Sequence, residues 1–230
     1  MAGVIAFLVS VQDADRFATI AGPGIELARE PDSLVMVLDG DDAFQARVDA
    51  ALDQLADVPD LEAAVILHED VLIRDPALAT KLRKLFADPA IAVAGPIGAT
   101  SVSSLAWWCG APVGHVDAPG GLVNGADPPG DVDALDGLML CLSPWAVRTL
   151  RFDPELAADF HGYDVDLCFQ ARFHGRRVVA IDLDLYHDHR PLFGDRDAWV
   201  RNELRFQQRW FSGPEVGLDR HEALKAPDRR

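Results

Sequence analysis

The stretch from Ala63 to Val71, which reads AAVILHEDV, places three polar side chains directly after an apolar run. His68, Glu69 and Asp70 bring an imidazole and two carboxylates to one point of the chain. Because side chains alternate along an extended chain, His68 and Asp70 share a face. Carboxylates and imidazoles bind divalent cations, and such a cation neutralises phosphate groups. The pattern favours a cation site with Asp70 as the better ligand over a merely solvated strand end.

Two further polar clusters follow downstream, HGYDVD at 161–166 and HDH at 187–189. His187 comes at the end of an apolar run, which predicts an exposed strand edge. Only one of the two histidines in HDH needs to bind the cation. An imidazole ligand would favour Mn²⁺ over Mg²⁺, since borderline cations accept nitrogen more readily. We expect the three clusters to form one site.

Acids at 164 and 166 have two interpretations. At the start of a helix they complement the helix dipole and bond its first amides. At the mouth of a cleft, Asp164 could instead take a proton from a hydroxyl group. His161 and Tyr163, just before it, could orient a polyol. Trp108, in the pair Trp107-Trp108, could stack on a sugar ring or pack in the core.

Asp39 and Asp41 follow a second apolar run. A carboxylate at this position can accept hydrogen bonds from a nucleobase or a ribose. Alternatively, Asp39-Gly40 forms a turn and Asp42 caps the next helix. The residue pattern leaves both interpretations open for Asp39 and favours the cap for Asp42.

Strands and helices alternate along the chain, which is typical of a parallel, doubly wound sheet. A loop-rich segment with a hairpin or two is expected at 95–134, where glycines and prolines gather. We expect one α/β domain over 1–212, with helices flanking a mostly parallel central sheet, and a tail over 213–230. The expected strands are 4–11, 33–38, 63–67, 91–94, 135–142, which Asp136-Gly137 interrupts, and 178–185. A short or broken helix is expected within 16–30, and further helices are expected over 43–56, after Pro76, from Ser143-Pro144, from Asp164 to Gly175 and over 197–210.

Composition restricts the class of partner. The chain has 230 residues and a net charge of −16, from 37 acidic and 21 basic residues. Because affinity for nucleic acids depends on basic surface, a nucleic-acid partner is not expected. No membrane span and no signal peptide are recognisable, and three cysteines without metal-ligand spacing suit a reducing compartment. The expected location is therefore cytoplasmic.

With these residues considered, the chain resembles the family 2-like glycosyltransferases of GT-A fold, and most closely their subgroup related to the streptomycin-biosynthesis transferase. The matching pieces occur in the family's order between about residues 63 and 190. They are VILHEDV at 65–71, VAG at 93–95, WCG at 108–110, VDALDG at 132–137 and FHGYDVDLC at 160–168.

The resemblance implies a nucleoside-diphosphate sugar as donor, a hydroxyl acceptor and a divalent cation, Mn²⁺ or Mg²⁺. It implies Asp70 and His187 as metal ligands and Asp164 as the catalytic base of an inverting reaction. The residues expected at the donor are Asp39, His68, Glu69 and Asp136; those expected at the acceptor are Trp108, His161 and Tyr163. The stretch 115–131 is expected to close over the donor.

Two residues differ from the family pattern. His68 stands where the family's Asp-x-Asp motif has its first acid, and Tyr163-Asp164 replaces the usual Glu-Asp pair. These departures keep open a non-catalytic module that binds a nucleotide sugar or a partner on the same fold. A metal-dependent nucleotidyltransferase is a third hypothesis. It is disfavoured because no basic, glycine-rich triphosphate loop follows the first strand.

Overall fold

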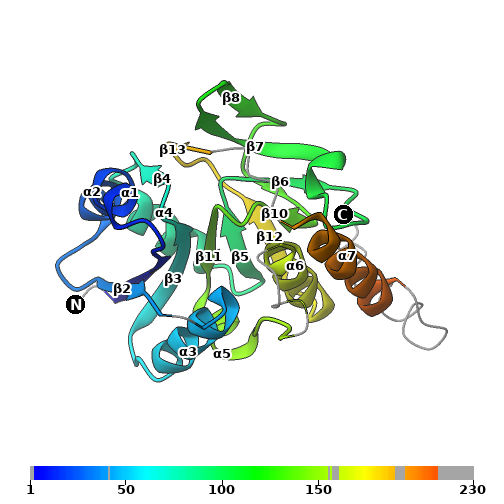
Figure 1. The fold of residues 1–230 in the computed structure, drawn as a ribbon. Helices are drawn as coiled ribbons and strands as arrows, with labels where there is room; N and C mark the ends of the chain where they lie inside the picture. The colour runs from blue at the N-terminus through cyan, green and yellow to red at the C-terminus, as the bar shows by residue number, and fades with distance from the viewer. Residues whose placement is uncertain (1–2, 41, 155, 157–160, 190–194, 212–230) are drawn as a thin grey trace.

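The computed structural model describes residues 3–40, 42–154, 156, 161–189 and 195–211, so Asp41, Phe160 and the predicted tail lie outside the described residues. Its central sheet has seven strands in the order β2-β1-β3-β11-β5-β12-β9 (Figure 1). The strands, in that order, are β2 (Leu34–Leu38), β1 (Val4–Ser10), β3 (Leu61–His68), β11 (Met139–Leu142), β5 (Ile91–Gly95), β12 (Arg177–Ala180) and β9 (Gly130–Asp131).

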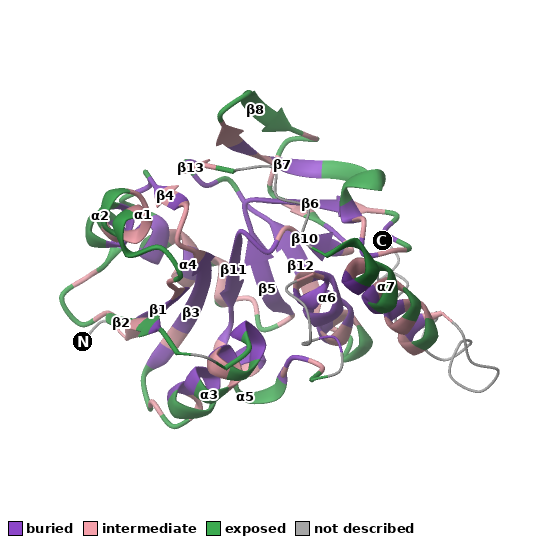
Figure 2. Ribbon diagram, viewed as in Figure 1, coloured by how far each residue is buried: buried purple, intermediate pink, exposed green. Residues whose placement is uncertain are grey.

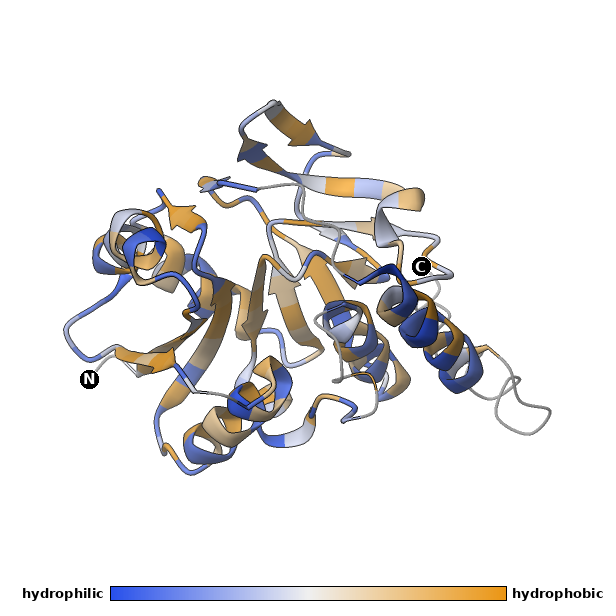
Figure 3. Cartoon of the chain, in the orientation of Figure 1, coloured by the Kyte–Doolittle hydropathy of each residue, from blue (hydrophilic) through white to orange (hydrophobic). Residues whose placement is uncertain are grey.

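The central sheet is mostly parallel, as the sequence predicts. β1 pairs in parallel with β2 and β3, and β12 pairs in parallel with β5, whereas β11 and β9 run antiparallel to their neighbours. The apolar run 63–67 is fully buried in the middle of this sheet. Helices cover a parallel sheet, so its inner strands are apolar without alternation. Figures 2 and 3 show these strands buried and hydrophobic.

The register of the ladders brings several strand ends to one edge. Ser10 of β1 pairs with Leu38 of β2 and with His68 of β3. On the other side of β3, Met139 of β11 pairs with Leu67, so the segment that precedes β11 lies at the same edge. Polar residues that follow β2 and β3, or precede β11, are therefore neighbours.

A second sheet occupies much of the stretch expected to be loop-rich. Its six strands have the order β10-β6-β7-β13-β4, and β8 pairs with β7. The predicted hairpin is confirmed by β7 and β8. The strands are β10 (Ala134–Leu135), β6 (Ile97–Thr100), β7 (Ala111–Ala118), β13 (Leu185–His187), β4 (Val71–Ile73) and β8 (Gly121–Asn124).

Glycines within these strands make the strands hard to recognise in the sequence. The glycines are needed where two backbone segments approach closely. Gly114, in the middle of β7, has a φ of +91°, and a Cβ there would lie 2.1 Å from the carbonyl oxygen of Pro96. A larger residue would separate β7 from the turn before β6. Glycine within a strand thus marks a tight contact here, although the same residue elsewhere indicates a loop.

The single strand predicted over 178–185 is wrong. β12 ends at Ala180 and belongs to the central sheet, whereas β13 begins at Leu185 and belongs to the second sheet. Between them, buried Ile181 and Leu183 alternate with exposed Asp182 and Asp184. This alternation is that of one strand, and periodicity cannot reveal that the pairing partner changes. The change of sheet carries His187 to Val71, its partner on β4.

Helices flank the central sheet in the predicted order (Figure 1). α1 and α2 confirm the expected break within 16–30. The helices are α1 (Ala14–Thr19), α2 (Ala21–Ala28), α3 (Phe44–Ala56), α4 (Leu78–Phe86), α5 (Pro144–Thr149), α6 (Tyr163–Phe173) and α7 (Arg196–Trp210), with one 3-10 turn, η1 (Trp107–Cys109). Among the described residues, no helix has the length and apolar character needed to cross a bilayer.

α6 and α7 lie side by side and are joined by an aromatic contact and a buried acid. The rings of Phe169 and Phe206 are 5.0 Å apart between centroids. The carboxylate of Asp166 accepts hydrogen bonds from Nε1 of Trp210 at 2.7 Å and from Gln170 at 2.7 Å. Of the two predicted acids at the start of α6, Asp166 therefore links α6 to α7.

Replacing Phe206 by Ala tests this packing. Phe206 is fully buried, and loss of a buried Phe side chain costs about 3 to 5 kcal/mol of unfolding free energy. Urea unfolding followed by circular dichroism measures it. The control is Leu204→Ala on the same helix, where a side chain that is 66% exposed should change stability by less than about 0.5 kcal/mol. Equal effects of the two substitutions would contradict the packing.

Candidate active site

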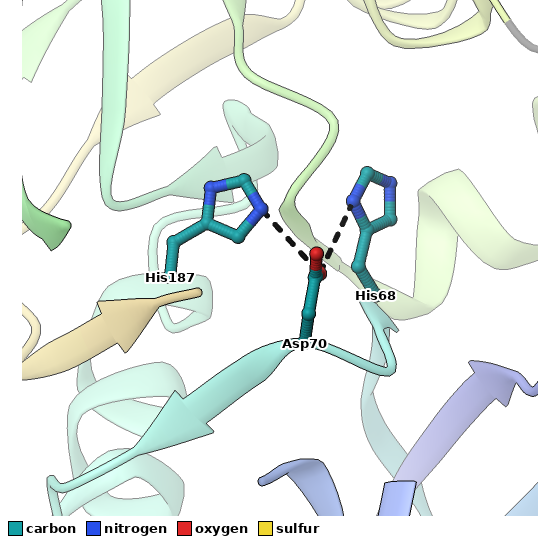
Figure 4. A group of neighbouring side chains, drawn as sticks. All are labelled: His68, Asp70 and His187. Atoms are coloured by element: carbon teal, nitrogen blue, oxygen red, sulfur yellow. Dashed lines mark ion pairs between the residues drawn. The ribbon is translucent and has the colours of Figure 1, made fainter. Parts of the chain in front are cut away.

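His68, Asp70 and His187 meet at the edge where β3 ends (Figure 4). Nδ1 of His68 lies 3.9 Å from Oδ1 of Asp70, and Nε2 of His187 lies 3.4 Å from the same oxygen. Figure 4 shows the two imidazoles on either side of the carboxylate. His68 is the last residue of β3, Asp70 precedes β4, and His187 ends β13. Two sheets therefore supply the cluster.

The two oxygens of Asp70 have different surroundings. Oδ2 lies 3.1 Å from Nη1 of Arg16. Oδ1 faces the imidazoles and, within the described residues, is buried without a hydrogen-bond partner. Burial favours the neutral carboxyl, but the contact with His187 and the charges nearby hold the pKa of Asp70 below its ordinary value. An ionised carboxylate oxygen and two imidazole nitrogens fit a borderline divalent cation such as Mn²⁺.

Tyr163 fixes the hydrogen-bonding state of His68. Burial lowers the pKa of His68 to about 4, so its imidazole is neutral at physiological pH. The hydroxyl of Tyr163 donates to the carbonyl of Gly137 at 2.9 Å and lies 2.8 Å from Nε2 of His68. Since the hydroxyl has a single proton, Nε2 must be the donor in the second contact. Nδ1 then keeps its lone pair on the side of Asp70, which suits a metal ligand.

Tyr163 itself is only 4% exposed. Its ring packs against Phe44 at 4.9 Å and Phe152 at 5.5 Å between centroids. Burial and the neighbouring acids raise the pKa of Tyr163 well above its ordinary value, so the phenol keeps its proton. The predicted contact with an acceptor stays a prediction, and the structure gives this residue a positioning role in addition.

Asp164 and Asp136 form an acidic pair beside the cluster. Oδ2 of Asp164 accepts a hydrogen bond from the amide of Gly137 at 2.9 Å, and Oδ1 of Asp136 accepts one from the amide of Leu138 at 3.0 Å. Burial, with the charge of Asp136, raises the pKa of Asp164 to about 7. Burial also raises the pKa of Asp136. A carboxyl with a pKa near neutral pH suits a general base.

Gly137, which sequence reasoning did not single out, joins these groups. Its carbonyl accepts from Tyr163 and its amide donates to Asp164. A Cβ at this position would lie 2.5 Å from the Tyr163 hydroxyl oxygen. The break between β10 and β11, visible in the sequence as Asp136-Gly137, was the signal for this close approach. α6 begins at Tyr163 after Gly162, so Asp164 is not the residue that caps the helix.

Glu69 and Asp39 lie at the same edge in different settings. Oε2 of Glu69 accepts hydrogen bonds from the amides of Gln12 at 2.6 Å and Asp13 at 2.9 Å. It therefore ties the loop between β1 and α1 to the turn that carries Asp70. Asp39 is exposed directly after β2. Direct contact of either residue with a donor stays a prediction.

The other two residues predicted at the acceptor are Trp108 and His161. Trp108, in η1, is 53% exposed and its ring meets the buried Trp107 edge-on at 6.2 Å. Trp107 therefore packs in the core, whereas Trp108 lies at the surface, where stacking on a sugar stays a prediction. The carbonyl of His161 accepts from Nδ2 of Asn202 at 2.9 Å. Their predicted acceptor contacts are not tested by these positions.

Arg16 is a second site residue that the sequence did not reveal. Besides Asp70, it pairs with the carboxylate of Asp188 at 2.9 Å and donates to its carbonyl. A lone arginine in a short helix after β1 carries no distinctive pattern. Only the register that aligns the ends of β1 and β3 brings it to the cluster.

Tyr163→Phe tests how the cluster is positioned. Without the hydroxyl, Nε2 of His68 loses its acceptor, and the affinity for Mn²⁺ should fall about tenfold, as for other outer-shell partners of metal ligands. Titration of Mn²⁺ followed by electron paramagnetic resonance measures this. Tyr186→Phe, which alters the other tyrosine of the chain, should bind Mn²⁺ like the wild type. Unchanged affinity in Tyr163→Phe would refute the positioning role.

Sequence comparisons found a family model and a relative that cover most of the chain. A family model described as "Glycosyltransferase like family" matches residues 7–208. The streptomycin biosynthesis protein StrF of Streptomyces griseus is 31% identical over 236 residues, which cover 97% of this chain and 82% of that protein.

Solved structures share the fold at low identity. GalNAc-T7 with UDP, GalNAc and Mn²⁺ has a TM-score of 0.62 at 9% identity, covering 91% of this chain and 49% of that one. The mannosyltransferase PcManGT of Pyrobaculum calidifontis, in complex with GDP-Man and Mn²⁺, has a TM-score of 0.50 at 14% identity, covering 96% and 68%. The chain thus spans about half the length of the first. These likenesses show a GT-A glycosyltransferase fold.

Proposed function

Because the chain belongs to the glycosyltransferase-like family whose model spans residues 7–208, we propose that it moves a sugar from a nucleoside-diphosphate sugar to an acceptor hydroxyl, with a divalent cation and inversion at the anomeric carbon. The observation that carries the proposal is the cluster of His68, Asp70 and His187 at the carboxyl edge of the central sheet. Ligands of open α/β sheets bind at this edge.

The distance from the end of β2 to the end of β3 matches the length of the donor's nucleoside. Asp39 follows Leu38, and Leu38 is two ladders away from His68 through Ser10. Neighbouring strands are about 4.8 Å apart, so this separation is roughly 10 Å, close to the span of a nucleoside. In this arrangement Asp39 meets the base or ribose, and the phosphates reach the cluster. The structural neighbours named above hold UDP or GDP-Man together with Mn²⁺.

His68, Asp70 and His187 would hold the cation, and two imidazoles in the set favour Mn²⁺ over Mg²⁺. A cation bound there supplies positive charge that stabilises the departing diphosphate. The ionised state of Asp70 and the neutral state of His68 are both those that a ligand needs. The chain's own residues therefore present the cluster ready to bind.

Asp164 is the proposed base. With a pKa of about 7, a large share of the carboxyl is ionised at neutral pH and still basic enough to accept a proton from the acceptor hydroxyl. Its hydrogen bond from Gly137 fixes the orientation of one oxygen. Removal of the hydroxyl proton strengthens the nucleophile as it attacks the anomeric carbon.

Metal-dependent donor binding is tested by thermal shift with UDP, GDP, dTDP and CDP, each with and without Mn²⁺. One diphosphate should raise Tm only when Mn²⁺ is present, since ligands of the native state stabilise it. Asp70→Asn should abolish the shift in Tm. The control Asp32→Asn, at an exposed position, should preserve it. A shift that persists in Asp70→Asn would place the cation elsewhere. The absence of any shift in the wild type would refute the donor site.

Asp164→Asn tests the base. Transfer should slow by about 10²-fold or more, while binding of Mn²⁺ and the diphosphate persists. Burial raises the pKa of Asp164 from 3.8 to about 7, so its ionisation destabilises the fold as pH rises through this window. The Asn variant should therefore be at least as stable as the wild type at pH 8.

The wild-type transfer rate should rise between pH 6 and 8, because only ionised Asp164 accepts a proton. A flat profile, or full activity of the variant, would contradict the assignment. Diphosphate binding without turnover of any donor sugar would instead favour the non-catalytic module, the alternative raised by His68 in place of the family's acid.

A further inference from the structure

Arg16 is held against the cation cluster by two carboxylates. Nη1 lies 3.1 Å from Oδ2 of Asp70, and Nη2 lies 2.9 Å from Oδ2 of Asp188. Its side chain is 14% exposed. Nε is buried and, within the described residues, has no hydrogen-bond partner. The guanidinium is thus a largely desolvated charge with one N–H donor that the described residues do not use.

The carboxylates of Asp13 and Glu69 fix the start of α1 and therefore the position of Arg16. Asp13 caps α1 by accepting from the amide of Arg16 at 3.0 Å. Glu69, next to Asp70 in the chain, accepts from the two amides that precede α1. The loop that leads into α1, the helix that carries Arg16, is therefore bound to the turn that carries Asp70. An arginine so fixed loses little entropy when it binds an anion.

Arg16 and the imidazoles use different oxygens of Asp70. The guanidinium lies on Oδ2, whereas both imidazoles face Oδ1. A cation bound through Oδ1 would therefore leave Arg16 in place at its side. Such a cation would also weaken the hold of Asp70 on Arg16, because it neutralises the shared carboxylate. An anion that bridges the cation and the guanidinium relieves the repulsion between them.

We propose that Arg16 recognises the diphosphate of the donor, moving from its carboxylate partners to phosphate oxygens when the nucleotide binds. The inference rests on the proposed function and adds a specificity-determining residue to it. Guanidinium groups bind phosphate through parallel N–H bonds, which a lysine cannot reproduce. Arg16 would thereby strengthen the preference for a nucleoside diphosphate over a monophosphate, because two phosphates offer more oxygens to share between the cation and the guanidinium.

Two ligands should respond to Arg16→Gln in opposite directions. Mn²⁺ alone should bind as tightly as in the wild type or more tightly, since a neighbouring positive charge is removed. The diphosphate, in the presence of saturating Mn²⁺, should bind about tenfold more weakly, as expected for the loss of a charged hydrogen bond. A substitution that merely disturbed the loop would weaken both.

The experiment uses calorimetry with the full chain and the diphosphate that gives the largest thermal shift, its monophosphate, and Mn²⁺ alone. Arg16→Gln should lower the preference for diphosphate over monophosphate about tenfold, and Arg16→Lys should lower it by less. The matched control is Arg29→Gln, an exposed arginine that pairs with Glu26, for which the preference should not change.

An unchanged preference in Arg16→Gln would overturn the assignment while the proposed function stands. Weaker binding of Mn²⁺ alone would also overturn it, because Arg16 would then act by supporting the ligand Asp70. A wild-type chain that binds neither Mn²⁺ nor any diphosphate would instead refute the proposed function, and this inference with it.

Discussion

Strand β3 is hydrogen-bonded to β1 on one side and to β11 on the other, and both ladders are in register at its last residues. His68 ends the strand, so whatever follows β1 or precedes β11 lies beside it. Arg16, Asp136 and Gly137 are brought to the cluster in this way from distant parts of the chain. A slip of one residue in either ladder would turn His68 to the opposite face and separate these groups.

Hydrogen bonds from the backbone make it possible to bury several acids together. Asp136 and Asp164 each accept from an amide in the short segment before β11, which offsets part of the cost of removing a carboxylate from water. The offset is incomplete, because burial still raises the pKa of both. The same imbalance that costs stability gives Asp164, the proposed base, a pKa near neutral pH.

Sequence patterns predicted that His68, Asp70 and His187 lie together, and they predicted the central sheet. Apolar runs that end in acids or histidines marked the ends of β3 and β13, and the order of elements predicted the parallel sheet. The second sheet escaped prediction because its strands are short and contain glycines, as at Gly114. The split between β12 and β13 escaped because alternation at 181–184 continues across it. Arg16 depends on strand register, which a single residue type does not signal. The close contact at Gly137 was marked in the sequence only by the Asp136-Gly137 interruption.

His68 belongs to the central sheet, His187 to the second sheet, and Asp70 to the turn between them. Within the described residues, the chain also crosses between the two sheets elsewhere, for example at Pro96 between β5 and β6 and over 181–184 between β12 and β13. Joint ligation of one ion would therefore cross-link the two sheets, which the polypeptide itself joins by short connections. An ion bound there would then stabilise the contact between the two sheets, because a ligand that binds only the native arrangement stabilises it.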